Sequence, residues 1–487
     1  MRKFCFMLML GAVAVAPLAA PAQTGLTVQT IPTQILTWPP AETTVLLAAF
    51  RNAAADGLDP DDYHPSSLAD ADLTRAALAY LSDLRRGRRA LKDLDDDVEL
   101  PGLPDRDAAD LADALKENRL SVFLADASPP GSQYQQLKAA LTFYRGIRAR
   151  GGWKELPPGL DWRGADRNLL RDRLAAEEPG LAANGDLAAA LRRFQARHGL
   201  LADGRLGATT LAELNIPVDA RVNQIMANME RWRWLPRALE QDRIEVNVPD
   251  ARLALVLNGS VALRSRVVVG KPRSPTPILR AEGAGITVNP PWNVPASIAR
   301  KEILPRLKRN PAYLLSQDMV LLDGPPGDPH GLRVRWRDIP AGTFPYRIQQ
   351  HPGRMNALGT VKIELPNRFD VYLHDTPAKR AFAAQARDIS HGCVRVERIL
   401  PLASYVLTEN LDAMTAISND VASGETEYLP LKRKLPVYFL YWTAFSAADG
   451  TLQFRPDIYG RDRRMTGALN QPSAPRLGAN FTGCPRG

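Results

Sequence analysis

The hydrophobic period of this 487-residue chain changes near residue 243, and that change limits the folds it can adopt. Before this point apolar residues recur at helical spacing, as in residues 68–91 and 137–150. After it apolar and polar residues alternate, as at Ile244, Val246 and Val248, which is the pattern of a half-buried strand. We therefore expect a multidomain α+β protein with a helical N-terminal part and a β-rich C-terminal part.

The N-terminus has the features of an export signal. Arg2 and Lys3 precede an apolar run over residues 4–20, and Ala20-Pro21-Ala22 has the small-x-small form of a signal-peptidase site. We predict a cleaved signal peptide over residues 1–22 and a location outside the cytoplasm. An uncleaved anchor is the alternative, although the apolar run is too short and flanked wrongly for a convincing membrane span.

Composition indicates a globular protein without nucleic-acid chemistry. Hydrophobic residues make up 45% of the chain and charged residues 24%. The formal net charge of +9 is spread widely and is interrupted by acidic segments such as residues 95–97. We find neither zinc-finger spacing nor a basic helix with interleaved aromatic residues, so we expect no nucleic-acid partner. The charge alone suits acidic polymers and membrane surfaces equally well.

The helical part is expected to contain a scaffold and a smaller module. Residues 23–180 read as a helical scaffold domain, and residues 181–220 form a compact unit in which Leu187, Leu191 and Phe194 fall at helical spacing. Gly199 suits a helix C-terminus, because glycine adopts the left-handed backbone conformation without strain. A connecting helix is expected over residues 221–242.

The β-rich part reads as a sandwich or a partly closed barrel over residues 243–415. An insert over about residues 296–345 breaks its strand rhythm and includes an expected helix at 297–310. An excursion of this length in a β domain is commonly a lid or a substrate-binding insert. Residues 416–487 are expected to hold C-terminal strands and a tail, with a strand in 437–445.

Cysteine usage draws attention to one residue. After signal cleavage only Cys393 and Cys484 remain, in a compartment where disulfides form readily. A disulfide between them is the structural alternative. A free thiol at Cys393, directly after His391-Gly392, is better explained by chemistry, because a thiolate with a nearby base attacks carbonyl carbon.

The residues around Cys393 supply candidates for each part of acyl transfer. Strand alternation places Tyr372 and His374 on one face at the end of a strand, so His374 is the candidate base. Cys393 shortly precedes a helix expected over residues 396–409, whose N-terminus would lower the thiol pKa. The N–H groups of Gly392 and Cys393 are candidate donors to an oxyanion.

The sequence argues against two alternative kinds of hydrolase. Papain-like enzymes place their histidine downstream of the cysteine, whereas all six histidines of this chain precede Cys393. A zinc hydrolase is disfavoured, because there is no His-Glu-x-x-His motif. A metal site built from His374, His391 and Cys393 stays open as a minor alternative; we expect no metal and no cofactor.

Taken together, these motifs resemble the L,D-transpeptidase catalytic domain, also called the YkuD domain. The resemblance is carried by His374 with Ser390-His391-Gly392-Cys393-Val394-Arg395 and extends to segments 270–277 and 289–295. Residues 181–220 resemble the peptidoglycan-binding type 1 domain, and the whole arrangement resembles the large periplasmic YcbB-type subfamily. Asp375 departs from the His-Gly-Thr of simpler members but fits the larger subfamily.

The resemblance implies peptidoglycan stem peptides as the partner and substrate. Cys393 would attack the amide between an L-centre and a D-centre of a tetrapeptide stem and release D-alanine, with His374 carrying the proton. An amine of a neighbouring stem would then resolve the thioester into a 3→3 crosslink. Water as the acceptor (an L,D-carboxypeptidase), a protein lysine as the acceptor, and a non-catalytic wall-binding protein are the alternatives.

The remaining site candidates have supporting roles. His391 would orient the loop or support the thiolate, with proton transfer as an alternative. Arg395 would bind a stem carboxylate as a bidentate fork, or else hold the loop through a salt bridge. The further candidates for substrate binding are Tyr372, Ser390, Trp292 and Asn293.

Overall fold

The computed structural model describes residues 35–89, 96–178, 180–181, 185–410 and 414–471. The expected signal peptide at 1–22 and the question of whether Cys484 is paired lie outside these residues. Within the described residues no helix is long and apolar enough to cross a membrane.

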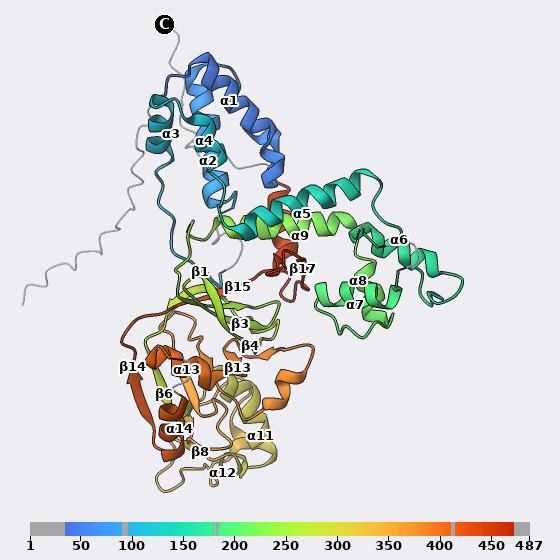
Figure 1. Cartoon of the computed structure of the whole chain (residues 1–487). Helices are drawn as coiled ribbons and strands as arrows, with labels where there is room; N and C mark the ends of the chain where they lie inside the picture. Colours follow the sequence, from blue (N-terminus) through green and yellow to red (C-terminus); the bar gives the residue numbers. More distant parts are fainter. Residues whose placement is uncertain (1–34, 90–95, 179, 182–184, 411–413, 472–487) are drawn as a thin grey trace, which may run out of the picture.

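Four helices near the N-terminus surround a core of their own, at the top of Figure 1. They are α1 Pro40–Arg51, α2 Asp70–Arg86, α3 Asp107–Lys116 and α4 Leu120–Ala125. In α2, Leu73, Ala77 and Leu81 repeat at helical spacing and are fully buried. The helix ends at Gly87, which has a φ of 83°. A residue with a side chain would be strained in this backbone conformation.

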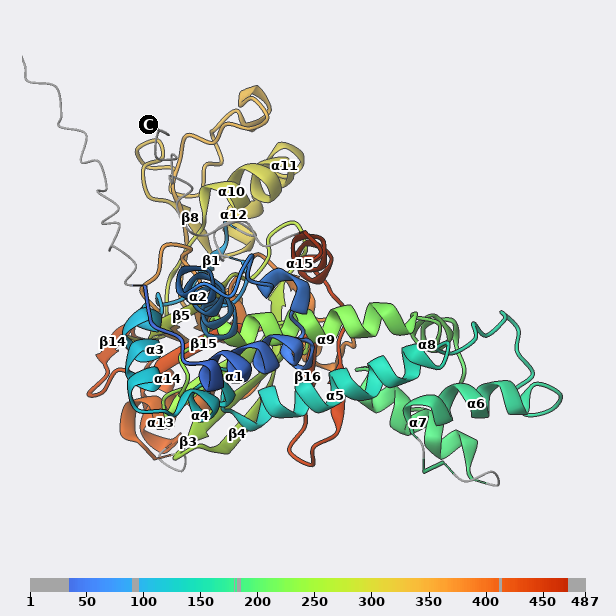
Figure 2. The ribbon, with the colours of Figure 1, turned by 90° about the horizontal axis from the view of Figure 1, so that it is seen from above.

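Two longer helices lie side by side below this bundle (Figures 1 and 2). Helix α5 Ser132–Ala149 and helix α9 Val218–Arg233 share a core with the hairpin of β16 Ala444–Ser446 and β17 Leu452–Phe454. Helix α5 falls within the range expected for the scaffold, yet its apolar face packs on α9 rather than into the core of the scaffold bundle. The two helices therefore join the N-terminal bundle to the rest of the molecule.

A small helical module projects from the far end of α5 and α9 (Figure 2). It consists of α6 Arg167–Glu177, α7 Leu187–Arg197 and α8 Ala208–Leu214 around their own apolar core. The side chain of Asp186 accepts hydrogen bonds from the N–H groups of Ala188 and Ala189 and caps α7. Helix α6 precedes the range expected for this module but supplies Leu170 and Leu174 to its core.

The C-terminal half is built on one large mixed sheet. Its strand order is β1-β5-β15-β2-β3-β4-β13-β11-β10-β6-β14, with β12 paired to β4. The strands are β1 Val98–Glu99, β2 Arg243–Asn247, β3 Arg252–Leu257, β4 Ser260–Gly270, β5 Ile278–Glu282, β6 Gly285–Val288, β10 Val361–Glu364, β11 Leu373–His374, β12 Asp388–Ser390, β13 Val394–Val396, β14 Glu427–Pro430 and β15 Pro436–Leu440. This sheet and the helical N-terminal part confirm the expected multidomain α+β class.

Two segments from outside residues 243–415 complete the sheet. Strand β1 comes from the connection between α2 and α3 and pairs in parallel with β5. Strands β14 and β15 come from the C-terminal part. Strand β14 pairs with β6, and strand β15 lies between β2 and β5. Helices α13 Ile399–Thr408 and α14 Met414–Ser423 pack on the sheet near β6 and β10. The β-rich part of the chain is therefore joined through its sheet to segments that lie before and after it in the sequence.

The insert folds as a separate lobe at the bottom of Figure 1. A three-stranded sheet of β7 Trp292–Asn293, β9 Ile348–Gln350 and β8 Met319–Leu321 packs with the short helix α12 Tyr313–Ser316. The expected helix at 297–310 is confirmed as α10 Ala296–Ile298, a π-helical turn Ala299–Ile303 and α11 Leu304–Arg309. The lobe spans β7 to β9 and is slightly longer than the expected 296–345.

Candidate active site

Cys393 lies in the tight turn between β12 and β13. Strand β13 pairs in parallel with β11, and this register sets His374 opposite Arg395. One residue earlier, the Val394 N–H donates to the Tyr372 carbonyl at 3.0 Å, which holds the Tyr372 and Cys393 positions side by side. Neighbouring strands therefore bring together the candidate nucleophile, the candidate base and Arg395.

The turn is held by hydroxyl groups on both sides. The Ser390 hydroxyl donates to the Cys393 carbonyl at 2.7 Å and accepts from the Gly392 N–H at 3.2 Å. The Thr276 hydroxyl donates to the Gly392 carbonyl at 2.7 Å and accepts from the Gly270 N–H at 2.9 Å. Gly392 has φ of 120°, a backbone conformation that strains any residue with a side chain. Ser390 is therefore a structural part of the turn.

These contacts correct the expected oxyanion donors. The Gly392 N–H is engaged by the Ser390 hydroxyl, because the turn folds back on itself there. The Cys393 N–H has no hydrogen-bond partner within the described residues. Cys393 N–H is therefore the backbone donor left for a developing oxyanion.

A second correction concerns the thiol. Strand β13 separates Cys393 from α13, which begins only at Ile399, so no helix N-terminus faces the sulfur. Burial raises the pKa of Cys393 above its ordinary value, while hydrogen bonds from Tyr372 and the charge of Lys362 act in the opposite direction. This shift favours the neutral thiol, which needs a base to become a nucleophile.

His374 meets that need as a neutral imidazole. Burial lowers the pKa of His374 to about 3, and the positive charge of Arg395 contributes to the shift. Backbone hydrogen bonds at Asp375 and Leu358 oppose it. The rings of Tyr372 and His374 meet edge to face, with centroids 5.5 Å apart. The imidazole is therefore unprotonated throughout the physiological range of pH.

Tyr372 and Lys362 line the thiol, and Lys362 was not found from the sequence. The Cys393 thiol donates to the Asp370 carbonyl at 3.5 Å. Burial together with the Cys393 charge raises the pKa of Tyr372, whose side chain lies near the sulfur. The Lys362 ammonium lies 4.2 Å from the centroid of the Tyr372 ring. Lys362 pairs with His374 across β10 and β11, a register that a single strand pattern cannot reveal.

Arg395 is half-buried and lies opposite His374, where β13 pairs with β11. Burial lowers the pKa of Arg395, and the Cys393 charge acts against the shift. The Arg395 Nε atom is buried without a hydrogen-bond partner, and no carboxylate of the described residues lies within ion-pair distance. The alternative of a salt bridge holding the loop is therefore not seen, and the guanidinium is available to a substrate carboxylate.

Asp375, the residue that departs from the simpler motif, has a structural role. Its Oδ2 atom accepts from the Thr360 N–H at 3.0 Å and from the Thr360 hydroxyl at 2.9 Å. Its Oδ1 atom forms an ion pair with Lys379. Gly359 lies so close that an added Cβ would be 2.5 Å from the Asp375 side chain. The carboxylate thus fixes the end of β11, where His374 is placed.

Two candidates lie in the insert. Trp292 packs against the apolar core of the insert, because β7 pairs with β9 there. The amide oxygen of Asn293 accepts a hydrogen bond from Gln349 at 2.9 Å. Neither residue contacts the turn of Cys393 in the described structure, so their expected role in the cleft stays a prediction.

His391 connects the turn to its surroundings. Its Nε2 atom lies 3.0 Å from the Lys271 ammonium and forms a short ion pair with Glu302 of the insert. The Lys271 N–H in turn donates to the Ser390 carbonyl at 2.9 Å. Lys271 and Glu302 were not found from the sequence, because they lie far from His391 along the chain.

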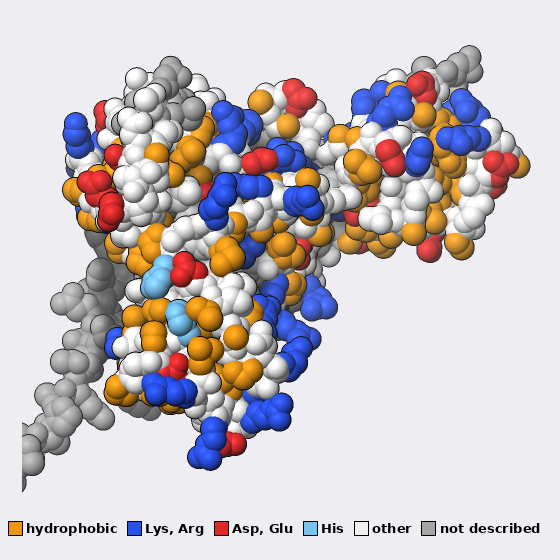
Figure 3. All heavy atoms as spheres, turned by 90° about the horizontal axis from the view of Figure 1, so that it is seen from below, with side chains coloured by type: hydrophobic (Ala, Val, Ile, Leu, Met, Phe, Trp, Pro, Cys, Tyr) orange, Lys and Arg blue, Asp and Glu red, His pale blue; other side chains and the backbone are white. Residues whose placement is uncertain are grey.

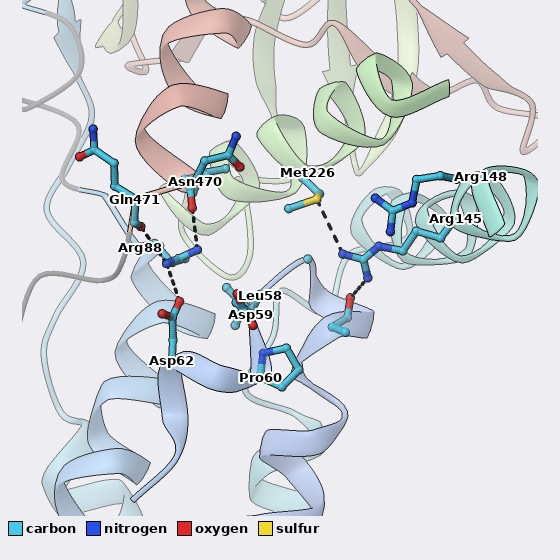
Figure 4. Close-up of a pocket in the computed structure, with 13 residues that line it drawn as sticks. Leu58, Asp59, Pro60, Asp62, Arg88, Arg145, Arg148, Met226, Asn470 and Gln471 are labelled. Carbon is cyan, nitrogen blue, oxygen red and sulfur yellow. Dashed lines mark hydrogen bonds and ion pairs between the residues drawn. The ribbon is translucent and has the colours of Figure 1, made fainter. Parts of the chain in front are cut away.

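One cavity lies away from the thiol. It has a volume of about 680 Å³ and lies where the N-terminal bundle meets α5, α9 and the C-terminal helix α15 Arg461–Leu469 (Figure 4). Arg88 contacts Asp62 at its edge, and Arg145 lies on the opposite side. In the described part of the chain, no group of three or more His, Cys, Asp or Glu residues could hold a metal ion.

Figure 3 shows the end of the molecule that carries the insert. Hydrophobic and histidine side chains gather on this face, and Lys and Arg side chains lie along its margin. Residues 296–309 of the insert include five basic residues, which are Arg300, Lys301, Arg306, Lys308 and Arg309. This face is therefore suited to a ligand with both apolar and acidic groups.

Comparison with known families agrees with the site. Residues 241–422 match the L,D-transpeptidase catalytic domain, YkuD. Residues 38–141 match a family described as "Scaffold domain", and residues 182–214 one described as "Putative peptidoglycan binding domain". Residues 241–422 are therefore similar to the L,D-transpeptidase catalytic domain, and two segments before them are similar to scaffold and peptidoglycan-binding domains.

Individual curated proteins and solved structures are also similar to this chain. A Haemophilus influenzae protein described as "Putative L,D-transpeptidase" is 34% identical over 248 residues, which are 51% of this chain and 50% of that protein. The match thus spans about half the length of the curated relative. An L,D-transpeptidase structure from Mycobacterium smegmatis has 11% identity and a TM-score of 0.19 over 41% of this chain and 58% of its own. An L,D-transpeptidase structure from Enterococcus faecium has 15% identity and a TM-score of 0.17, over 46% of this chain and 65% of its own.

Proposed function

We propose that this protein is a peptidoglycan L,D-transpeptidase that forms 3→3 crosslinks through a thioester on Cys393. The observation that carries the proposal is the pairing of β11 with β13, which sets buried, neutral His374 beside the turn of Cys393. A neutral base next to a neutral thiol favours proton transfer coupled to attack on a carbonyl group. The YkuD match supports this class of acyl transfer.

The first half-reaction forms the acyl-enzyme. The Cys393 thiol transfers its proton to His374 while its sulfur attacks the carbonyl carbon between the L-centre and the D-centre of the donor stem. The Cys393 N–H stabilises the oxyanion, because it has no other partner in the described structure. When the C–N bond breaks, His374 returns the proton to the amine of the departing D-alanine, and a thioester is left on Cys393.

The second half-reaction transfers the acyl group. The amine of a neighbouring stem attacks the thioester carbonyl, the C–S bond breaks, and a new amide links the two stems. His374 takes the proton of the attacking amine and the thiolate is protonated again, so the enzyme returns to its starting state. Arg395, with no carboxylate partner of its own in the described residues, binds a stem carboxylate and orients the donor.

The proposed location is the periplasm or cell envelope, where peptidoglycan is accessible. This rests on the signal-like N-terminus and on the peptidoglycan-binding match at residues 182–214. The separate module would hold the enzyme on the wall polymer while the active site works on the stems. Exported protein in a periplasmic fraction, with an N-terminus beginning after Ala22, is the expected result; full-length protein in the membrane fraction would favour the uncleaved anchor.

Product analysis tests the reaction itself. Incubation of the purified protein with a disaccharide-tetrapeptide should yield a crosslinked dimer and free D-alanine, resolved by liquid chromatography and mass spectrometry. Cys393→Ala should yield neither product. Tripeptide without dimer would show an L,D-carboxypeptidase, and unchanged substrate with the wild type would favour a non-catalytic wall-binding protein. Stem peptide attached to a protein lysine would identify the third alternative.

A further inference from the structure

One carboxylate of the insert points at the catalytic turn. Glu302 lies in the π-helical turn Ala299–Ile303 and forms ion pairs with His391 and, at 3.6 Å, with Lys271. The Lys271 ammonium is also 3.0 Å from the His391 ring. His391 is only two residues before Cys393, so this carboxylate lies beside the Lys271 ammonium and the His391 ring at the edge of the candidate active site. Single π-helical turns of this kind are frequent at functional sites.

The surrounding sequence makes this carboxylate unusual. Glu302 is the single acidic residue between 296 and 309, a segment that also carries the five basic residues named above. Within the described residues those five side chains form no ion pair, whereas Glu302 forms two, both with groups outside the insert. A basic helix therefore contacts the catalytic turn through its one negative charge.

We propose that Lys271 and His391 form a binding site for a carboxylate of the acidic peptide substrate, and that Glu302 occupies this site until substrate displaces it. This inference rests on the proposed function and names a substrate-recognition site within it. The carboxylate of Glu302 stands in for the substrate group, so the insert and the substrate compete for the same two side chains. Binding of the substrate releases the insert helix from the turn.

The exposure of the three side chains allows such an exchange. Lys271, His391 and Glu302 retain 37%, 34% and 36% of their side-chain exposure, so each is reachable from solvent. Ion pairs this exposed are weak, because water and salt screen them. A buried pair would resist displacement, whereas this one yields to a ligand that brings a carboxylate of its own and further contacts with the cleft.

Steady-state kinetics with the disaccharide-tetrapeptide test the competition, because the two partners should change KM in opposite directions. Glu302→Gln removes the internal competitor and should lower the donor KM by about fivefold, the most that an exposed pair supports. Lys271→Met removes part of the site and should raise KM by about fivefold. Both variants should keep kcat, since neither residue touches the reacting atoms.

The matched control is Asp338→Asn, which removes one negative charge from the insert where Asp338 contacts only Arg335 at the surface. It should leave KM unchanged. If Glu302→Gln raises KM, or if both variants lower kcat, Glu302 positions the turn instead of competing with substrate, and the inference is wrong. Covalent labelling of Cys393 by a carbapenem is followed in every variant, because loss of labelling in the wild type would overturn the proposed function rather than this site.

Discussion

At the scale of single residues, burial is the main cause of the pKa shifts in the site. His374 and Cys393 are both shifted toward their neutral forms by burial, which lowers the pKa of the imidazole and raises that of the thiol. The resting site is therefore a thiol–imidazole pair rather than a thiolate–imidazolium pair. Such a site protects the thiol from oxidation, because the thiolate is the reactive form.

The pH dependence of Cys393 alkylation follows from the directions of these two pKa shifts. Above pH about 3 His374 is already neutral, and the Cys393 thiol gives up its proton to water only above its ordinary pKa. The rate of alkylation by iodoacetamide should therefore rise through a midpoint above pH 9, with no step between pH 5 and 7. Intact-protein mass spectrometry measures the rate, and a midpoint below pH 7 would show a stabilised thiolate instead.

Ser390 gives a second test at this scale. Ser390→Ala removes the hydroxyl that joins the Cys393 carbonyl to the Gly392 N–H. The loss of two hydrogen bonds should cost about 1–2 kcal/mol of turn stability and slow carbapenem acylation by roughly tenfold. Ser390→Thr keeps the hydroxyl and should recover most of the rate. Equal rates for Ser390→Ala and the wild type would show that the turn does not depend on this hydroxyl.

At the scale of elements, the pairing of β11 with β13 is what assembles the site. The strand over Tyr372 and His374, the turn before β13 and the helix after it could be predicted from local patterns. Their pairing could not, because register depends on partners distant in sequence, as shown by Lys362 opposite His374 and by Lys271 against the turn. The prediction that a helix N-terminus lowers the pKa of the Cys393 thiol was wrong for a related reason. The three-residue strand β13, which is too short to recognise in the sequence, separates Cys393 from α13.

The end of β11 depends on Asp375. Asp375→Ala would leave Thr360 and Lys379 without their partner and should destabilise the protein by about 2–3 kcal/mol, since buried groups lose hydrogen bonds. Asp375→Asn keeps the acceptor toward Thr360 and should cost less. Urea unfolding measures both, and the acylation rate should fall in the same order. An Asp375→Ala protein as stable and active as the wild type would contradict this structural role.

At the scale of the whole molecule, the large sheet gathers segments from the entire chain. Strand β1 from the N-terminal bundle and β14 and β15 from the C-terminal part flank strands of the catalytic domain. Family patterns in the sequence located the catalytic, scaffold and peptidoglycan-binding parts. They could not show that α5 packs on α9 or that α6 joins the small module, because an amphipathic helix does not specify which apolar face it meets.

The small module is joined to α9 and to the β16–β17 hairpin through buried His198. Its imidazole lies 2.8 Å from Glu213 and stacks between Phe194 and Phe454, and burial lowers its pKa to about 4. The unfolded value is about 6.5, so the folded state binds fewer protons and loses stability as the pH falls from 6.5 toward 4.

His198→Phe keeps the stacking but removes this titration. The Tm of the wild type should therefore fall more steeply between pH 7 and 5 than that of the variant, as measured by calorimetry. Parallel curves for the two proteins in this range would show that His198 does not contribute to the pH dependence. Acidic residues that do not interact with His198 are common to both proteins and cancel in the comparison, whereas the pKa values of Glu213 and Glu177 depend on His198.

The central claim is that Cys393 forms a covalent acyl-enzyme with His374 as its base. The most direct measurement is intact-protein mass spectrometry after incubation with a carbapenem, whose strained ring offers an acyl group to a nucleophilic thiol. We predict one adduct on the wild type, mapped to Cys393, a much slower adduct on His374→Asn and none on Cys393→Ala. An unmodified wild type, or an adduct that persists in Cys393→Ala, would contradict the account.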